Sequence, residues 1–219
     1  MGKRVGVLLS GCGVFDGAEI HEAVLTLLAL DRNGAGIVCA APDMPQLHVV
    51  NHMTTEEMNE SRNVLIESAR IARGNIIDLK HLIVDDIDAL IIPGGYGAAK
   101  NLSNFAVKGP QAEVHPQVQR VLEQMLAAGK PIGAICIAPA TLTKALAQHE
   151  PEVTIGMDEG TASAIESMGG RHRVCQVDQI HVDTRHKIVT TPAYMLGPGI
   201  KDVAEGIEKL VAQVLAMID

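Results

Sequence analysis

The sequence predicts an α/β fold built around a largely parallel β-sheet. Short apolar runs alternate along the chain with longer stretches in which apolar residues recur with a period of about 3.6, the pattern of strands that cross over through helices. The chain has 219 residues, the size of one α/β domain. It contains no stretch of linker composition and no internal repeat. We therefore expect a single domain over residues 1–219.

The amino-terminal third predicts a strand, a glycine-rich turn, a helix and a second strand. The first strand covers residues 5–9, and the turn covers residues 10–17. The apolar residues that indicate the helix and mark one face of it are Ile20, Val24, Leu27 and Leu28. Asn33 and Gly34 are suited to end this helix, and residues 37–40 form the next apolar run.

The second half repeats this alternation. Residues 89–92 form a continuous apolar strand that ends at Pro93-Gly94-Gly95. A helix follows, with an apolar face formed by Val118, Val121, Leu122, Met125 and Leu126, and Gly129 closes it. Residues 131–135 predict another strand, and residues 136–147 a helix. The last helix is the clearest, because apolar residues keep helical spacing from Ile200 to Val214. Residues 42–80 are harder to interpret and predict one helix with connecting loops.

Charge and composition exclude several classes of partner. The net charge is 18 − 26 = −8, which repels both nucleic-acid backbones and anionic lipid headgroups. Two Phe, two Tyr and no Trp leave little on which unpaired bases could stack. No apolar run approaches the roughly 20 residues that cross a bilayer, and residues 5–9 are too short for a signal-peptide core. We expect a cytoplasmic protein that binds neither nucleic acid nor membrane.

The sequence gives no support for a metal or a nucleotide cofactor. The four Cys form no CxxC pair, and among the His only His48 and His52 have i, i+4 spacing, without an acidic residue between them. The loop at residues 11–17 partly matches a dinucleotide-binding turn. It has Asp16 where that motif needs glycine, and Ala40-Ala41 where a ribose-binding acid would stand. We expect no cofactor and no metal.

Cys136 is the main candidate for chemistry. It lies where the strand at residues 131–135 runs into a helix, and such a turn can project its central side chain above the carboxyl edge of a parallel sheet. A helix N-terminus stabilises an anion, so the position predicts a thiol that loses its proton more readily than usual. Pro139 stands where a first-turn proline is tolerated. The alternative is that Cys136 is a small buried hydrophobe.

Two further segments suit a site beside this cysteine. Gly94 and Gly95 end a strand and allow backbone N–H groups to approach a ligand, as an oxyanion hole requires; the alternative is an ordinary tight turn. Glu19 stands at the start of a helix, where a carboxylate is usually only a partner for the helix dipole. Cys39 and Cys175 lie in apolar or strand-like surroundings and are expected in the core.

Taken together and in this order, these segments resemble the class I glutamine amidotransferase-like superfamily, which includes the PfpI proteases and the deglycases. The similar segments are Gly17-Ala18-Glu19, the Pro93-Gly94-Gly95 turn followed by Asn101-Leu102-Ser103, and Ala134-Ile135-Cys136 followed by Ala138-Pro139-Ala140. Residues 10–22, 95–105 and 190–195 resemble more closely the ElbB-type glyoxalases, also described as isoprenoid-biosynthesis proteins with an amidotransferase-like domain. The likeness covers nearly the whole chain.

The resemblance implies a flavodoxin-like three-layer sandwich that forms a homodimer. It implies that Cys136 is the nucleophile, that Glu19 is the neighbouring acid, and that backbone N–H groups around Gly95 and Ile137 form the oxyanion hole. The chain departs from its relatives at a third position. Many of them carry a histidine where this chain has Ile137, and the deglycases carry one where it has Gly156, so a Cys-His-acid triad is not expected.

Glyoxalase chemistry without glutathione needs few groups. The sequence therefore predicts that the Cys136 thiolate adds to an aldehyde of a small dicarbonyl, with Glu19 as the base and with the two groups sharing one proton at rest. His21 should face elsewhere on its helix, and nothing selects among Asp16, His52 and Cys12 as helpers. Two other functions remain open: a redox sensor with Cys12 as the resolving thiol, and an amidotransferase-like binding subunit with a vestigial site.

Overall fold

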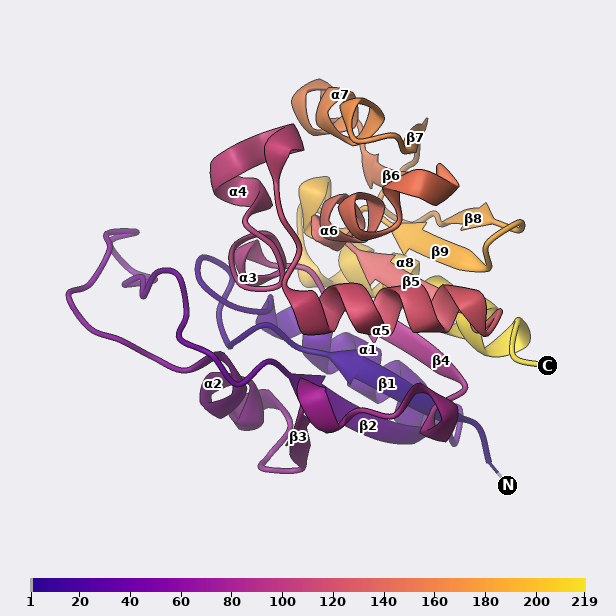
Figure 1. The fold of residues 1–219 in the computed structure, drawn as a ribbon, viewed down its shortest axis with the longest axis horizontal. Helices are drawn as coiled ribbons and strands as arrows, with labels where there is room; N and C mark the ends of the chain where they lie inside the picture. Colours follow the sequence, from indigo (N-terminus) through magenta and orange to yellow (C-terminus); the bar gives the residue numbers. More distant parts are fainter. Residues whose placement is uncertain (1) are drawn as a thin grey trace.

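The computed structural model describes residues 2–219, and its centre is a seven-stranded sheet with the order β3-β2-β1-β4-β5-β9-β8 (Figure 1). All neighbouring strands run parallel except β8, which pairs antiparallel with β9. The strands are β1 (Arg4–Leu8), β2 (Gly36–Ala41), β3 (Ile76–Asp78), β4 (Ala89–Ile92), β5 (Ile132–Ile135), β8 (His181–Asp183) and β9 (Ile188–Thr191). A separate parallel pair is formed by β6 (Glu152–Gly156) and β7 (Arg171–Val174).

Helices cover both faces of the sheet and give the predicted three-layer sandwich. One core lies between the sheet and α5 (Pro116–Ala127) with α6 (Ala138–Ala145). The other lies between the sheet and α1 (Ile20–Arg32), α2 (Val64–Ile71) and α8 (Ile200–Ala216). The short helices α3 (Tyr96–Lys100) and α4 (Phe105–Lys108), together with α7 (Glu159–Ser167), lie at the carboxyl end of β4 and β5 (Figure 1). No helix within residues 2–219 is long and apolar enough to cross a membrane.

Most elements predicted from the sequence are confirmed, with bounds that differ by one or two residues. The strand at residues 89–92 is β4, and all four of its residues are buried. Gly129, with φ of +64°, follows α5 as predicted, and Asn33 is the C-cap of α1. Within residues 42–80 the structure contains α2, the one helix that the sequence predicted there, and β3, a short edge strand that it did not predict.

Helix α1 turns three of the four residues of its predicted apolar face away from the core, and the fourth, Leu27, is half-buried and packs against the core. Ile20, Val24 and Leu28 are 43%, 47% and 39% exposed. The inward face is formed by Glu22, Ala23, Thr26, Ala29 and Leu30, all of them buried. The period of 3.6 correctly predicted a helix, and the structure shows that the buried face of this helix is not the face marked by Ile20, Val24 and Leu28.

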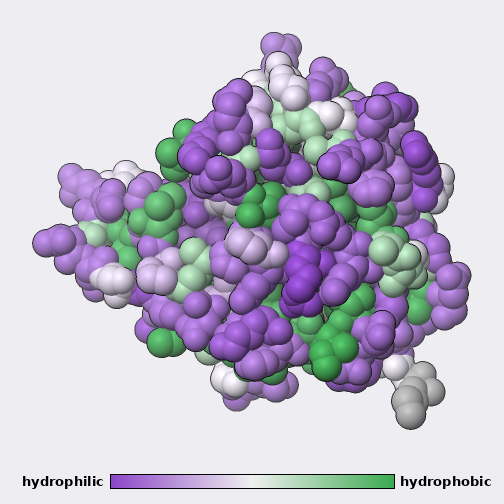
Figure 2. Space-filling model, in the orientation of Figure 1, coloured by the Kyte–Doolittle hydropathy of each residue, from purple (hydrophilic) through white to green (hydrophobic). Residues whose placement is uncertain are grey.

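The side of the molecule that carries α5 is mainly hydrophilic, and hydrophobic residues gather there only in small separate patches (Figure 2). This agrees with the net charge of −8. Cys39 and Cys175 are each 6% exposed, which confirms their predicted place in the interior.

Candidate active site

Cys136 occupies a strained turn between β5 and α6. Its φ of +60° lies in the left-handed region, which non-glycine residues rarely adopt. The turn is held from the neighbouring strand, because the Cys136 N–H donates to the Thr191 carbonyl at 3.0 Å. Pro139 stands in the first turn of α6, as predicted. The sequence therefore folds into an elbow that presents the sulfur at the carboxyl edge of the sheet.

The thiol of Cys136 lies at the wall of a cavity of about 440 Å³. The side chain is 8% exposed, so it is buried without being sealed. The cavity is lined by Val14, Glu19, Gly95, Tyr96, Ala99, Phe105, Ala106, Cys136, Ile137, Asp158, Thr161, Tyr194 and Met195. The structure thus brings together four of the predicted site residues: Cys136, Glu19, Gly95 and Ile137.

Glu22 lies directly behind the thiol. It comes from the inward face of α1, is fully buried, and is in hydrogen-bond contact with the Cys136 side chain. Its carboxylate also accepts the N–H of Gly94 at 2.9 Å and that of Tyr194 at 3.3 Å. This corrects the prediction for the neighbouring acid: the carboxyl in contact with the thiol belongs to Glu22, one helical turn beyond Glu19.

Glu19 has two visible roles. Its Oε2 accepts the N–H of Glu22 at 2.7 Å, which makes Glu19 the N-cap of α1 and bears out the simpler interpretation of this residue. Its side chain also lines the cavity beside Cys136. Glu22 therefore contacts the sulfur from behind, while Glu19 is available to a molecule inside the cavity.

The backbone around the sulfur supplies hydrogen-bond donors. The N–H groups of Gly95 and Ile137 both point at the Cys136 sulfur and stabilise its anionic form. Gly94, the third predicted donor, is not available, because its N–H is bonded to Glu22. Position 94 must still be glycine, since a Cβ there would lie 2.4 Å from the Cys136 Cβ.

Burial raises the pKa of the Cys136 thiol well above its ordinary value, and the nearby Glu22 carboxyl raises it further. The N–H groups of Gly95 and Ile137 oppose this rise without cancelling it. The expectation of an unusually acidic thiol is therefore wrong for the resting protein. Desolvation of the buried sulfur outweighs what two N–H groups at the start of a short helix contribute.

Burial also raises the pKa of Glu22, to about 8, and the Glu19 carboxyl adds to this rise. Hydrogen bonds from Tyr194, Gly94 and Cys136 act in the opposite direction. Both members of the pair thus hold protons more tightly than usual, the direction that the sequence predicted for an acid beside Cys136. Glu22, once ionised, is the carboxylate placed to accept the thiol proton.

Within residues 2–219, no histidine lines the cavity beside Cys136 as the third member of a triad. Ile137 lines the cavity, and Gly156 ends β6 with φ of +95°. A Cβ at position 156 would lie 2.7 Å from Leu196 Cγ and 3.2 Å from Pro192 Cβ. The space that a histidine side chain would enter is therefore filled by Leu196 and Pro192.

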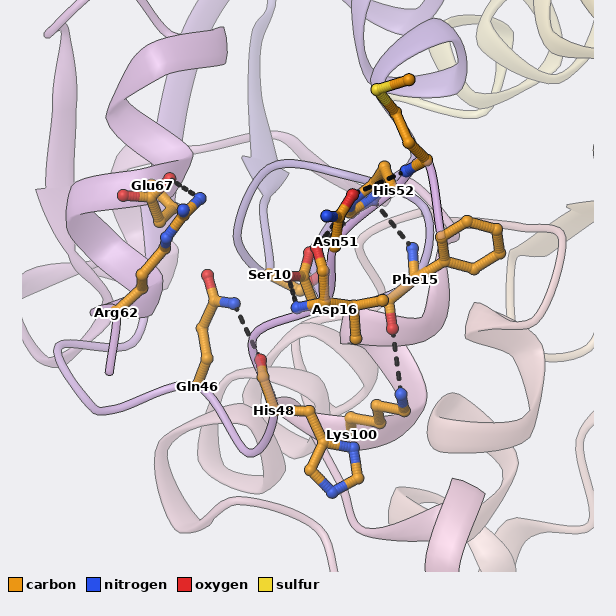
Figure 3. Close-up of polar contacts among 12 residues, drawn as sticks. Ser10, Phe15, Asp16, Gln46, His48, Asn51, His52, Arg62, Glu67 and Lys100 are labelled. Carbon is orange, nitrogen blue, oxygen red and sulfur yellow. Dashed lines mark hydrogen bonds and ion pairs between the residues drawn. The ribbon is translucent and has the colours of Figure 1, made fainter. Parts of the chain in front are cut away.

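The first loop and the segment after β2 hold each other in place outside the cavity (Figure 3). Asp16 accepts the N–H of Val50 at 2.8 Å and lies 3.8 Å from His52 Nε2. His52 Nε2 accepts the N–H of Phe15 at 3.3 Å, and Lys100 Nζ donates to the Phe15 carbonyl at 2.9 Å. Asp16 and His52 therefore lie together and hold the first loop against the segment after β2.

The remaining candidates lie outside the cavity wall. Cys12 is half-buried, and burial raises its pKa, with Glu67 adding to the rise. His21 Nδ1 lies 2.7 Å from the Tyr194 hydroxyl. Among residues 2–219, no group of three or more His, Cys, Asp or Glu side chains is placed to hold a metal ion.

Sequence reasoning missed Glu22 and the backbone of Tyr194. The signal for Glu22 was its spacing of three from Glu19, since an N-cap and the residue three positions later lie on the same side of a helix. Tyr194 offered no signal, because it acts on Glu22 through its backbone N–H.

Comparison with known proteins shows close relatives over almost the whole chain. The family model described as "DJ-1/PfpI family" matches residues 12–158. The human protein named glutamine amidotransferase-like class 1 domain-containing protein 3, mitochondrial, is 48% identical over 98% of this chain and 83% of its own length. The zebrafish protein named ES1 protein, mitochondrial, is 34% identical over 98% of this chain and 86% of its own length.

Solved structures agree with this. An isoprenoid biosynthesis protein with an amidotransferase-like domain from Ehrlichia chaffeensis is 38% identical, with a TM-score of 0.93 over 99% of this chain and 100% of its own. Glyoxalase III from Candida albicans is 15% identical, with a TM-score of 0.63 over 99% of this chain and 98% of its own, and shares the fold.

The expected cytoplasmic location is contradicted by the relatives, since the human, rat and zebrafish proteins are all named mitochondrial. Composition could not have revealed this. Targeting segments, and not the composition of the folded domain, determine the compartment.

Proposed function

The chain belongs to the DJ-1/PfpI family, and from that premise we propose that it is a cofactor-independent glyoxalase, which converts small dicarbonyls such as glyoxal to 2-hydroxy acids. The observation that carries the proposal is the Cys136–Glu22 pair at the wall of an open cavity, with the N–H groups of Gly95 and Ile137 aimed at the sulfur. This arrangement supplies a nucleophile, an acceptor for its proton and donors for an oxyanion.

The first step forms a hemithioacetal. Glu22 takes the thiol proton, and the Cys136 sulfur attacks the aldehyde carbon C1. The C–S bond forms, and the electron pair of the carbonyl moves to its oxygen. The N–H groups of Gly95 and Ile137 stabilise this oxyanion before the proton held by Glu22 neutralises it.

The second step is an internal redox shift. A base removes the proton on C1, the electron pair forms a C1=C2 double bond, and the C2 carbonyl pair moves to its oxygen, which takes a proton to give an enediol. Protonation at C2 and loss of the C1 hydroxyl proton then leave a thioester at C1. Carbon C1 is oxidised and C2 is reduced, so no external oxidant or reductant is needed. Glu19 is assigned as this base, because it lines the cavity, whereas Glu22 does not line it and already exchanges its proton with the sulfur and the oxyanion beside it. Water then hydrolyses the thioester, which releases the 2-hydroxy acid and restores the thiol.

The test is conversion of glyoxal to glycolate without glutathione. Wild type is compared with Cys136→Ala and with Cys12→Ser, a matched control in which a thiol outside the cavity is removed. We expect turnover by wild type and Cys12→Ser and background rates for Cys136→Ala. Equal rates of glyoxal conversion for wild type and Cys136→Ala would contradict the proposal.

Two other functions make different demands on the same residues. A redox sensor needs an accessible thiol of low pKa, whereas burial raises the pKa of Cys136 and leaves it 8% exposed. An amidotransferase-like binding subunit is favoured by the missing histidine and by the biosynthetic role named for the Ehrlichia protein. It predicts partner binding that survives Cys136→Ala without aldehyde turnover by wild type.

A further inference from the structure

The cavity beside Cys136 is much larger than a two-carbon dialdehyde requires. Its volume is about 440 Å³, whereas one water occupies about 30 Å³ in the liquid. Cavities of roughly 300–1,000 Å³ typically enclose ligands of drug size. Glyoxal bound at Cys136 would leave most of this space unfilled, so the cavity has room for a substantial group attached to the dicarbonyl.

The walls that would contact such a group are mainly apolar. They are formed by Val14, Ala99, Phe105, Ala106, Ile137 and Met195. Tyr96 and Tyr194 add two aromatic rings, which gather three of the chain's four aromatic side chains at this cavity. Contact between an apolar substituent and these walls removes apolar surface from water and increases affinity in proportion to the area covered.

The charges at the cavity disfavour an anion. The charged lining residues within residues 2–219 are Glu19 and Asp158, both acidic. Asp158 is the N-cap of α7, and hydrogen bonds from the Thr161 side chain and from the Thr161 N–H, the latter at 2.7 Å, hold the pKa of its carboxyl below the ordinary value. The nearby Lys100 Nζ lies 5.3 Å from the Tyr96 ring centre, but it donates to the Phe15 carbonyl and does not line the cavity.

From this combination of size, walls and charge we propose a substrate class: an uncharged 2-oxoaldehyde whose second carbon carries an aryl or branched-alkyl group. The group packs against Phe105 and its apolar neighbours, and Asp158 with Glu19 selects against anionic dicarbonyls. The inference rests on the proposed function and keeps its chemistry. The sulfur adds to the aldehyde carbon, one proton moves from C1 to C2, and water releases an aryl- or alkyl-substituted 2-hydroxy acid.

The first experiment compares three substrates with the wild-type protein: methylglyoxal, phenylglyoxal and 4-carboxyphenylglyoxal. Each kcat/KM is divided by the rate at which the same aldehyde adds to a small free thiol, which corrects for intrinsic reactivity. We expect the corrected value for phenylglyoxal to exceed that for methylglyoxal by about tenfold or more. We expect 4-carboxyphenylglyoxal to fall about tenfold below phenylglyoxal.

The second experiment removes the apolar wall. Phe105→Ala should reduce the preference for phenylglyoxal over methylglyoxal by about tenfold, and Phe105→Leu should reduce it less. The matched control is Val107→Ala, which shortens an exposed side chain of the same helix outside the cavity. If Phe105→Ala does not fold, the graded effect of Phe105→Leu and the substrate comparison on wild type still decide the outcome.

The third experiment removes one charge. Asp158→Asn keeps an N-cap for α7 but should raise the kcat/KM for 4-carboxyphenylglyoxal relative to phenylglyoxal by about three- to tenfold. Glu159→Gln is the matched control, because it removes the same charge from the next residue, which does not line the cavity.

The outcomes separate the inference from the proposed function. Turnover of all three aldehydes with no preference for phenylglyoxal, or with a preference for the carboxylate, overturns the substrate class and leaves the glyoxalase proposal standing. Absence of turnover for all three, with no adduct on Cys136 by mass spectrometry, overturns both.

Discussion

The two faces of α1 depart from the usual distribution of polar and apolar side chains, because the inward face buries two polar side chains beside Ala23, Ala29 and Leu30. The inward face carries Glu22 and Thr26, both fully buried, and the outward face carries Ile20, Val24 and Leu28, each more than a third exposed. Burying a carboxyl costs free energy unless it is hydrogen-bonded, and Glu22 has partners in Gly94, Tyr194 and Cys136. The inward face of α1 is therefore the face that places Glu22 beside the Cys136 sulfur, and hydropathy alone could not identify it.

The largest expected effect of a change on the inward face is on activity. Glu22→Gln should lower kcat/KM for glyoxal by about 10²–10⁴-fold, because the thiol proton loses its acceptor. Thr26→Val, one turn further along the same face, removes only a hydroxyl that donates to the Glu22 carbonyl. It should change kcat/KM by less than about threefold. Comparable losses in the two variants would mean that general disruption of the face, and not the carboxyl, explains the effect.

The same carboxyl should couple stability to pH. In the folded protein the pKa of Glu22 is raised to about 8 from an ordinary value of 4.5. Between these values the folded state holds a proton that the unfolded state has lost, so this contribution is complete below pH 4.5 and is lost as pH rises through 8. Its size is on the order of 5 kcal/mol.

Chemical denaturation at a series of pH values measures this coupling. The free energy of unfolding of wild type should fall across that window more steeply than that of Glu22→Gln. Parallel pH profiles for the two proteins would show that Glu22 titrates normally.

A substitution of Glu19, at the start of the same helix, separates its role as the N-cap of α1 from its proposed role as a base. Glu19→Ser keeps a side-chain oxygen that can cap α1 but removes the carboxylate from the cavity, so stability should change by less than about 1 kcal/mol. The kcat/KM for glyoxal should fall about tenfold or more if Glu19 moves the proton on C1. Thermal melts and steady-state kinetics check the two effects. An unchanged kcat/KM in a folded Glu19→Ser variant would show that Glu19 is not the base that removes the proton on C1.

On the outward face the expected effect on activity is the smallest. The homodimer implied by the family resemblance stays a prediction, and the exposed stripe of α1 is apolar surface that a second copy would cover. Val24→Lys combined with Leu28→Lys should then shift the sedimentation coefficient from dimer to monomer. Ile66→Lys, at a more exposed apolar position on α2, serves as the control. A wild-type monomer, or a dimer that persists in the double variant, would contradict the prediction.

The sequence predicted the fold class and the elbow because both depend on local patterns. An apolar run ending at Pro93-Gly94-Gly95 located β4, an apolar run ending at Cys136 located β5, and the cysteine at that strand-to-helix junction located the proposed nucleophile. Glu22 was missed because its role depends on the packing of α1 against the turn after β4, which is a contact between distant segments. The pKa of Cys136 was predicted in the wrong direction for a related reason: the helix start is visible in the sequence, but the depth of burial is not.

The most direct test of the Cys136–Glu22 pair is the rate of alkylation of Cys136 by iodoacetamide as a function of pH, followed by mass spectrometry of the peptide that contains it. In wild type, loss of the Glu22 proton creates the acceptor for the thiol proton, so the rate should rise with a midpoint near pH 8. In Glu22→Gln that midpoint should disappear. The same midpoint in both proteins would show that Glu22 does not control the ionisation of the thiol.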